Sequence, residues 1–284
     1  MTTILVMADN LFSAGLGGQY PAHTVSAEEE PAGYEAWRVG TTRRDPLDKA
    51  TASTANSAWW LRCVFDRLRA HNCIVIDRGH NLAGETWELR STVDATDFTG
   101  TYETLFDITH PSFSMPGAID NGIGVVTEEG AWIKRYPLRV GKAVELYIDA
   151  MGAGIKPELV NVWVGLAVEV GGARRPYDQD SHEMVSLAIE SESGWTGRAR
   201  RTRRRRGNLT VRLGADSEYE YLIREQVTQK FGDGLPMWIV PDTARAEQMF
   251  LATRAEGVMS YPHTEDSLHR DIVVEYVEHE PKPF

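Results

Sequence analysis

An alternation of apolar and polar residues recurs along the chain and predicts a mainly β protein. The runs Trp59–Phe65 and Cys73–Ile76 are strongly apolar, and Thr86–Thr92 alternates between apolar and polar positions. A polar turn, Arg78–Asn81, separates the second run from the third. Strand-like segments joined by a Gly/Asn turn are typical of antiparallel pairing, so we expect Cys73–Ile76 and Thr86–Thr92 to form one corner of a β-sandwich.

The rest of the chain repeats the β pattern, with one helix as the exception. Ser217-Glu218-Tyr219-Glu220 is a capping box, and apolar residues follow it at helical spacing, which predicts an α-helix over 217–230. The polar segments Pro21–Ala58 and Pro111–Gly130 are expected to be loops. Further strands are expected at Thr3–Met7, Ala131–Ile133, Lys142–Asp149, Val160–Val170, His182–Ser191, Asn208–Leu213, Leu235–Val240, Gln248–Arg254 and Asp271–Glu278.

One short segment has the composition of a domain boundary. Met151–Pro157 is small, glycine-rich and closed by proline. We therefore expect a first domain over residues 1–150 and a second over 158–284. The expected fold class is mainly β, with two antiparallel β-sandwich-type domains, of which the second packs the helix 217–230 against its sheet.

Length and composition fit a globular protein. The 284 residues, 42% of them hydrophobic, suffice for one large or two ordinary domains with real cores. No apolar run reaches the roughly 18 residues of a membrane-spanning helix, and the N-terminus lacks a basic flank, so we expect synthesis in a cytoplasm and no membrane insertion. Cys63 and Cys73 lie in neighbouring apolar runs, which favours buried small hydrophobes over a metal pair.

Charge is strongly segregated along the chain. Residues 198–206 read RARRTRRRR, and removing these seven arginines from a net charge of −11 leaves −18 on the rest of the chain. The run has three possible roles: phosphate contacts to nucleic acid, a solvated hairpin, or an interface with an acidic neighbouring subunit. The absence of interleaved aromatics disfavours nucleic acid, and arginine forks pair carboxylates bidentately. We expect a subunit interface formed by Arg198, Arg200, Arg201, Arg203, Arg204, Arg205 and Arg206.

The sequence holds no catalytic signature. A nucleophile elbow, a P-loop, a dinucleotide-binding fingerprint and the H-E-x-x-H motif are all absent. His182-Glu183 is not followed by a second histidine at helical spacing, and carboxylate pairs such as Glu128-Glu129 are common on acidic surfaces. We therefore expect a protein that is not an enzyme, with no catalytic residue, no metal site and no cofactor.

Several motifs together resemble a known group. A long polar segment, then Trp59-Trp60-Leu61-Arg62-Cys63-Val64-Phe65-Asp66, then a strand leading to Gly79-His80-Asn81-Leu82-Ala83-Gly84 resembles the discoidin-like modules that open certain bacteriophage tail proteins. The resemblance continues at Val162–Gly165, Arg175–Tyr177, Ser193–Trp195 and Leu235–Asp242. A sandwich flanked by a single helix is also the general plan of phage tail-tube proteins.

The resemblance implies a structural role in a phage tail, near its distal end or tube. The expected partners are other copies of the chain in a ring and further tail proteins, and the expected location is the virion. The alternative is a carbohydrate-binding adhesion module that recognises host-surface glycans, since discoidin-like sandwiches bind sugars or lipids through their loops. Trp37, His80, Trp87 and Trp132 would then form an aromatic shelf. The structural alternative for His80 and Asn81 is that they hold the turn, with the tryptophans in the core.

Overall fold

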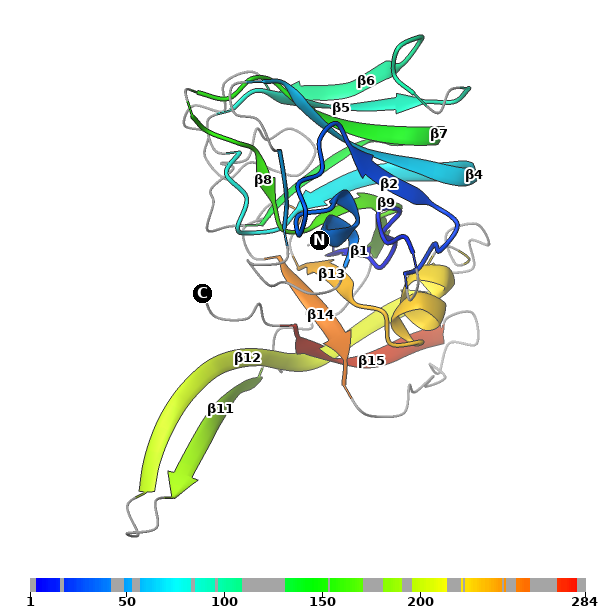
Figure 1. Cartoon of the computed structure of the whole chain (residues 1–284). Helices are drawn as coiled ribbons and strands as arrows, with labels where there is room; N and C mark the ends of the chain where they lie inside the picture. The colour runs from blue at the N-terminus through cyan, green and yellow to red at the C-terminus, as the bar shows by residue number, and fades with distance from the viewer. Residues whose placement is uncertain are drawn as a thin grey trace. The chain divides into compact units, whose positions relative to one another are not determined.

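The structure is a computed structural model of the chain (Figure 1). It describes residues 4–15, 18–41, 49–52, 57–82, 85–94, 97–108, 131–152, 154–170, 181–190, 196–213, 221, 223–241, 243, 249–255 and 270–279, and within 181–190 and 196–204 it describes the backbone. Contacts divide the chain into two units. We call the unit built around residues 9–167, to which residues 240–249 and 281–284 are also assigned, the insert unit, because the segment 9–167 lies in the sequence between residues 8 and 168 of the other unit. That host unit comprises residues 1–8, 168–239 and 250–280.

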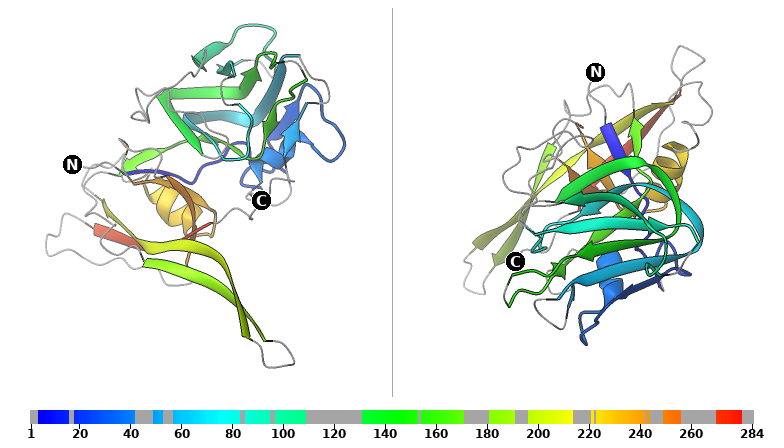
Figure 2. Two further views of the ribbon diagram at one scale, coloured as in Figure 1. Left: turned by 90° about the vertical axis from the view of Figure 1, so that its left-hand side faces the viewer. Right: turned by 90° about the horizontal axis from the view of Figure 1, so that it is seen from above.

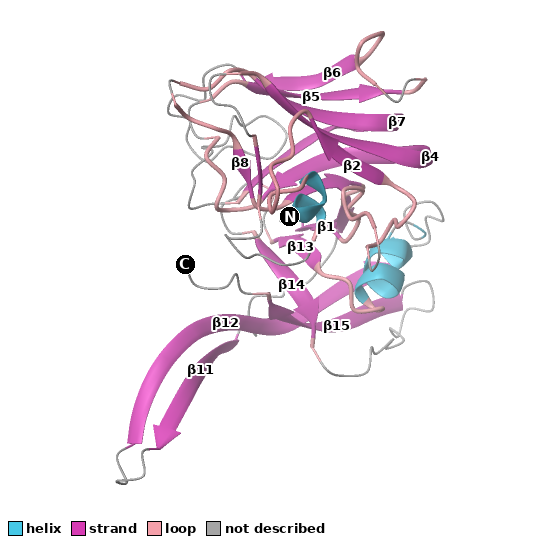
Figure 3. Cartoon of the chain, viewed as in Figure 1, coloured by secondary structure: helices cyan, strands magenta, loops and turns pink. Residues whose placement is uncertain are grey.

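Antiparallel strands build the insert unit, as the alternation predicts (Figure 3). Its six-stranded sheet has the order β2-β4-β7-β5-β6, and β9 pairs with the second half of β4. The strands of this sheet are β2 (Thr24–Ala27), β4 (Trp59–Ile76), β5 (Trp87–Thr92), β6 (Glu103–Ile108), β7 (Trp132–Ile148) and β9 (Val162–Gly165). A 3-10 turn, η1 (Ala36–Gly40), and the pair β3 (Ala50–Thr51) and β8 (Glu158–Leu159) complete the unit.

Two long, curved strands form the centre of this unit (Figure 2). The sequence predicts separate strands at Trp59–Phe65 and Cys73–Ile76, but both belong to β4, which is 18 residues long. Register shifts interrupt its pairing with β7 after Val64 and after His71. Bulges of this kind bend a strand without ending it, so a polar stretch in mid-strand imitates a loop in the sequence.

The predicted corner between Cys73–Ile76 and Thr86–Thr92 is wrong in its pairing. β7 lies between β4 and β5 and pairs with both, so these two strands are not neighbours in the sheet. The intervening turn is instead tied to the segment before β9. The amide of Asp77 donates to the carbonyl oxygen of Asn161 over 3.0 Å.

The core of the insert unit follows the alternation of β4. Trp59, Leu61 and Cys63 are at most 1% exposed, whereas the residues between them are half-buried. Cys63 and Cys73 are free and buried, as expected. Burial raises the pKa of the Cys63 thiol well above its usual range, so this cysteine behaves as a small hydrophobe.

The host unit is a seven-stranded sheet with the order β10-β1-β13-β14-β15-β12-β11. Its own apolar core includes Leu209, Val227 and Phe250. No helix among the described residues is long and apolar enough to cross a membrane. The strands are β1 (Ile4–Met7), β10 (Val168–Val170), β11 (Ser181–Glu190), β12 (Thr196–Leu213), β13 (Met237–Val240), β14 (Phe250–Arg254) and β15 (Arg270–Glu278).

The predicted helix is present in part. The capping box Ser217–Glu220 lies outside the described residues, and the helix η3 spans Arg224–Phe231. It is a π-helix rather than the expected α-helix. Its apolar positions Ile223 and Val227 are buried, as the helical spacing predicts. The loop expected at Pro111–Gly130 also lies outside the described residues.

The division into units differs from the sequence-based boundary at Met151–Pro157. β8 and β9 follow that segment but pair with β3 and β4 of the insert unit. At the other end of the chain, β1 pairs with β10 in the host unit. The insert unit therefore begins after Ala8 and continues to Ala167.

Candidate functional site

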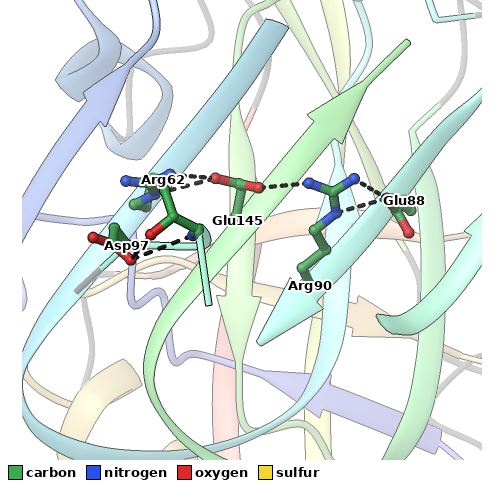
Figure 4. A network of polar contacts seen from close by, with 6 residues as sticks. Arg62, Glu88, Arg90, Asp97 and Glu145 are labelled. Atoms are coloured by element: carbon green, nitrogen blue, oxygen red, sulfur yellow. Dashed lines mark hydrogen bonds and ion pairs between the residues drawn. The ribbon is translucent and has the colours of Figure 1, made fainter. Parts of the chain in front are cut away.

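A row of charged side chains crosses three strands on the outer face of the insert sheet. Arg62 on β4 and Arg90 on β5 are both register partners of Glu145 on β7. Arg62 contacts Glu145 Oε2 through Nη2 at 2.7 Å and Nε at 3.1 Å, and Arg90 Nη1 lies 3.1 Å from Oε1 (Figure 4). Because the Glu145 side chain is 2% exposed, these two guanidinium groups compensate a carboxylate that is withdrawn from water.

A second carboxylate extends the network toward β6. Arg90 Nε donates to Glu88 Oε1 at 2.6 Å, and the Thr104 hydroxyl donates to Glu88 Oε2 at 3.1 Å. Burial of Arg90 lowers the pKa of its guanidinium, but the hydrogen bond with Glu88 and the nearby charges of Glu88 and Glu145 outweigh this and raise it. The network thus pairs two arginines with two glutamates, whose formal charges balance.

Aromatic rings pack against the first guanidinium. The Cζ atom of Arg62 is 4.2 Å from the centre of the Trp60 ring and 5.0 Å from the centre of the Phe98 ring. Trp60 precedes Arg62 by two residues on β4, so both side chains lie on the same face of the sheet. The positive charge is thus held by a carboxylate and by the electron-rich faces of two rings.

The second guanidinium has a similar surrounding. The Cζ atom of Arg90 is 3.8 Å from the centre of the Tyr147 ring and 4.8 Å from that of Tyr102. Tyr147 is the register partner of Trp60 on β4, so rings and charges occupy adjacent rows. We call this surface the arginine–aromatic face: Trp60, Arg62, Glu88, Arg90, Phe98, Tyr102, Glu145 and Tyr147.

The loop between β5 and β6 contributes two of these rings. Asp97 accepts hydrogen bonds from the backbone amide and the hydroxyl of Thr99, at 3.3 Å and 2.9 Å (Figure 4). This local turn fixes the loop that carries Phe98 and Tyr102, whose ring centres are 6.0 Å apart. Phe98 is buried, but Tyr102 is 39% exposed.

The arginine–aromatic face presents groups that can contact a ligand. Tyr102 and Trp60 leave part of their rings accessible. Within the described part of the chain, no hydrogen bond is found for Nη1 of Arg62, so this group can donate to an incoming oxygen atom. The described residues contain no cluster of histidine, cysteine or carboxylate side chains that could hold a metal ion.

The four residues expected to form an aromatic shelf do not assemble one. Trp87 and Trp132 are at most 4% exposed, and their rings meet edge to face with centres 4.9 Å apart inside the core. His80 is also buried, and its Nδ1 accepts a hydrogen bond from the amide of Leu82 at 3.1 Å. These contacts favour the structural interpretation of the turn. Trp37, on η1, is the one member of the four on the surface, at 48% exposed.

The expected arginine interface lies in a strand. The sequence places the run between two strand candidates, but all of Arg198–Arg206 belongs to β12. The side chains of Arg205 and Arg206 lie near carboxylates of the host unit: Arg205 Nε is 3.9 Å from Glu278 and Arg206 Nη2 is 3.9 Å from Glu275. The other five side chains lie outside the description, so their role at a subunit interface stays a prediction.

Comparison with known proteins identifies carbohydrate-binding modules as structural neighbours. No family model matches the chain, and no curated protein matches it. A chitosan-binding module from the chitosanase/glucanase of Paenibacillus sp. IK-5 is 14% identical, with a TM-score of 0.40, over 55% of this chain and 97% of the module. A second module of that enzyme, solved with chitotriose, is 11% identical, with a TM-score of 0.39, over 50% of this chain and 95% of the module. A module from Clostridium perfringens, solved with GalNAc-β-1,3-galactose, is 8% identical, with a TM-score of 0.37, over 51% of this chain and 95% of the module.

One expectation is confirmed by the structure, and another finds no support. The mainly β, antiparallel sandwich is present as predicted. The resemblance to phage tail proteins has no support among the comparisons. The similarity covers about half of this chain in each case.

Proposed function

We propose that the insert unit is a non-catalytic carbohydrate-binding module and that its arginine–aromatic face contacts the sugar. The observation that carries this proposal is the placement of partly exposed rings beside two guanidinium groups that are already fixed by the buried carboxylate of Glu145. These contacts, rather than the partial likeness to known modules, support the function.

The chemistry of the face matches that of a sugar ring. The apolar side of a pyranose packs against an aromatic ring, and its hydroxyl groups need donors and acceptors at defined positions. Tyr102 offers such a ring at the surface, and Arg62 offers Nη1 as a donor to a hydroxyl or carboxylate oxygen. Because Glu145 holds Arg62 in place before any ligand arrives, little side-chain entropy is lost on binding.

The test is a glycan array probed with the full-length chain, followed by calorimetric titration of the glycan that it retains best. We expect Tyr102→Ala to weaken binding about tenfold, since loss of one stacking ring removes on the order of 1 kcal/mol. Tyr34→Ala is the matched control, because Tyr34 has the same exposed fraction as Tyr102, 39%, and belongs to the same unit. It should bind as the wild type does.

Three results would overturn the proposal in distinguishable ways. Retention of no glycan removes the function altogether. Equal binding by wild type and Tyr102→Ala, with loss of binding in Trp37→Ala, places the sugar at η1 and leaves the arginine–aromatic face as a structural feature. Chemical change of the bound glycan, followed by mass spectrometry, would contradict the non-catalytic part of the proposal.

A further inference from the structure

The hairpin of β11 and β12 extends past the sheet of the host unit (Figure 1). β11 pairs with residues 196–206 of β12, whereas β15 pairs only with residues 206–213. Among the described residues, 181–190 and 196–205 therefore form a ribbon of two strands without a third strand beside them. We call this ribbon the arm.

A β-bulge in the arm changes which of its residues share a face. Val185 pairs with Thr202, but the next residue, Ser186, pairs with Arg200. Arg201 is thus the extra residue, and every position of β12 beyond it moves to the face opposite the one that regular alternation would give. The bulge lies in the middle of the arginine run.

The shifted register sorts the arm into a basic face and an apolar face. Paired residues of antiparallel strands share a face, so one face is assigned on β12 to Arg205, Arg203, the bulged pair Arg201 and Arg200, and Arg198. The other face, beyond the base of the arm, is assigned to Thr202, Ala199 and Gly197 opposite Val185, Leu187 and Ile189. Arg206 and Arg204, at the base of the arm, are also assigned to this second face, and with regular alternation in place of the bulge Arg200 and Arg198 would join them.

The apolar row lies on the face opposite the core of the host unit. Leu209 is 1% exposed and belongs to that core. The register between Arg205 and Leu209 is regular, so the arginine row continues the face of Leu209 and the apolar row continues the other one. Arg205 marks the edge of the core, because its Cζ atom is 5.2 Å from the centre of the buried Phe250 ring. Val185, Leu187 and Ile189 are therefore assigned to the face of the strand pair that does not carry Leu209.

We infer that the arm docks on a second copy of this chain. A two-stranded ribbon is only marginally stable by itself, and an apolar row on the face away from the host core, on strands with no third strand beside them among the described residues, favours association with a partner. Charge complementarity identifies this partner: outside residues 198–206 the chain carries a net charge of −18. A second copy can cover the apolar row and face the arginine row with carboxylates. Nucleic acid would satisfy the arginines alone, and its phosphates would be repelled by the rest of the chain.

The experiment is sedimentation equilibrium of the full-length chain over a range of concentrations. We expect the wild type to self-associate and raised salt to weaken the association. Insertion of one serine between Val185 and Ser186 gives Arg201 a partner, removes the bulge and moves Arg200 and Arg198 to the other face, and should raise the dissociation constant about tenfold or more. Arg206→Ser is the charge control: it removes one positive charge from the arginine run, but Arg206 lies outside the arginine row and its side chain is 48% exposed. It should change the constant by no more than about twofold.

Two further variants separate docking from folding of the arm. Arg198→Ser/Arg200→Ser keeps the bulge and lowers charge in the arginine row, and Leu187→Ser alters the apolar row alone. Both should weaken association while leaving the far-UV circular dichroism of the chain unchanged. A wild type that stays monomeric at high concentration overturns the inference, as does self-association that none of the three arm variants weakens. Binding to duplex DNA by a wild type that does not self-associate would assign the arm to nucleic acid instead.

Discussion

Arg62 and Glu145 lie directly opposite each other on β4 and β7, and both Nε and Nη2 of Arg62 donate hydrogen bonds to Oε2 of Glu145. The two residues are 83 positions apart in the sequence, so this contact fixes the pairing of the two longest strands of the insert unit. A slip of the register by one residue would move both charges to the core face.

The first prediction concerns this pair. Arg62→Met leaves the carboxylate of Glu145 with Arg90 as its only described cationic partner. Glu145→Met removes the carboxylate that Arg62 and Arg90 share. Each variant should lower the free energy of unfolding by about 2–4 kcal/mol, because a buried charge loses compensation. The double variant should be less destabilised than the sum of the two by about 1–3 kcal/mol. Urea denaturation measures all three values, and simple additivity would show that the contact does not couple the strands.

The second prediction concerns His71. Its imidazole is buried, with Nδ1 2.9 Å from the Tyr136 hydroxyl and Nε2 3.2 Å from Ser91 Oγ. Desolvation lowers the pKa of His71 from 6.5 to about 4. Between pH 6.5 and pH 4 the unfolded chain therefore binds a proton at His71 that the folded chain does not bind. The contribution of His71 to the free energy of unfolding should be fully present above pH 6.5. It should fall by up to about 3 kcal/mol as the pH drops from 6.5 toward 4.

The variant His71→Gln checks the origin of this dependence. It lacks the titrating group, so its free energy of unfolding should vary less between pH 7 and pH 4.5 than that of the wild type, whatever its absolute stability. Nuclear magnetic resonance titration of the His71 ring gives an independent readout. A ring that protonates near pH 6.5 in the folded protein contradicts the prediction.

The third prediction concerns Gly40. A Cβ atom at this position would lie 1.9 Å from the carbonyl oxygen of Phe12. This oxygen belongs to the backbone, so no change of side-chain rotamer can relieve the clash. Gly40→Ala should therefore destabilise the protein by about 1–3 kcal/mol or more. Gly100→Ala is the control, because a Cβ atom there meets nothing within 4 Å. Thermal unfolding should show a lowered midpoint for the first variant and a nearly unchanged one for the second.

The fourth prediction concerns the two units. A fragment of residues 9–167 contains β8 and β9 and should fold by itself, whereas residues 1–150 lack both and leave β1 without β10. Reciprocally, joining Ala8 to Val168 through an Asn-Gly turn should give a folded host unit, because β1 and β10 are antiparallel neighbours with Val6 opposite Val168. Circular dichroism and cooperative thermal unfolding assess both products. Folding of 1–150 together with aggregation of 9–167 would return the boundary to Met151–Pro157.

The sequence predicted the strands well because their alternation is local. Trp59, Leu61 and Cys63 are buried as their spacing requires, and Ile223 and Val227 are buried on the helix. The order of strands was not predictable from such patterns, because the pairing of β7 with both β4 and β5 depends on contacts between distant segments.

The candidate site was missed for the same reason. Alternation assigns Arg62, Arg90 and Glu145 to the polar face of their strands, but only the strand order brings them into one row. Trp87 and Trp132 were predicted to belong to an aromatic shelf on the surface, yet large aromatic side chains on a buried strand are ordinary core residues.

The split host unit imposes an order on biosynthesis. β1 emerges first, but its partner β10 follows more than 160 residues later along the sequence, so β1 waits while the insert unit is made. The insert unit brings its own ends together, since Asp9 Oδ2 accepts a hydrogen bond from the amide of Leu166 at 3.0 Å. Once it has folded, Ala8 and Val168 are held close. Folding of the insert unit has then already offset the entropic cost of closing the long loop between β1 and β10. The insert unit thus acts as a built-in template that delivers the first strand of the host sheet to its neighbour.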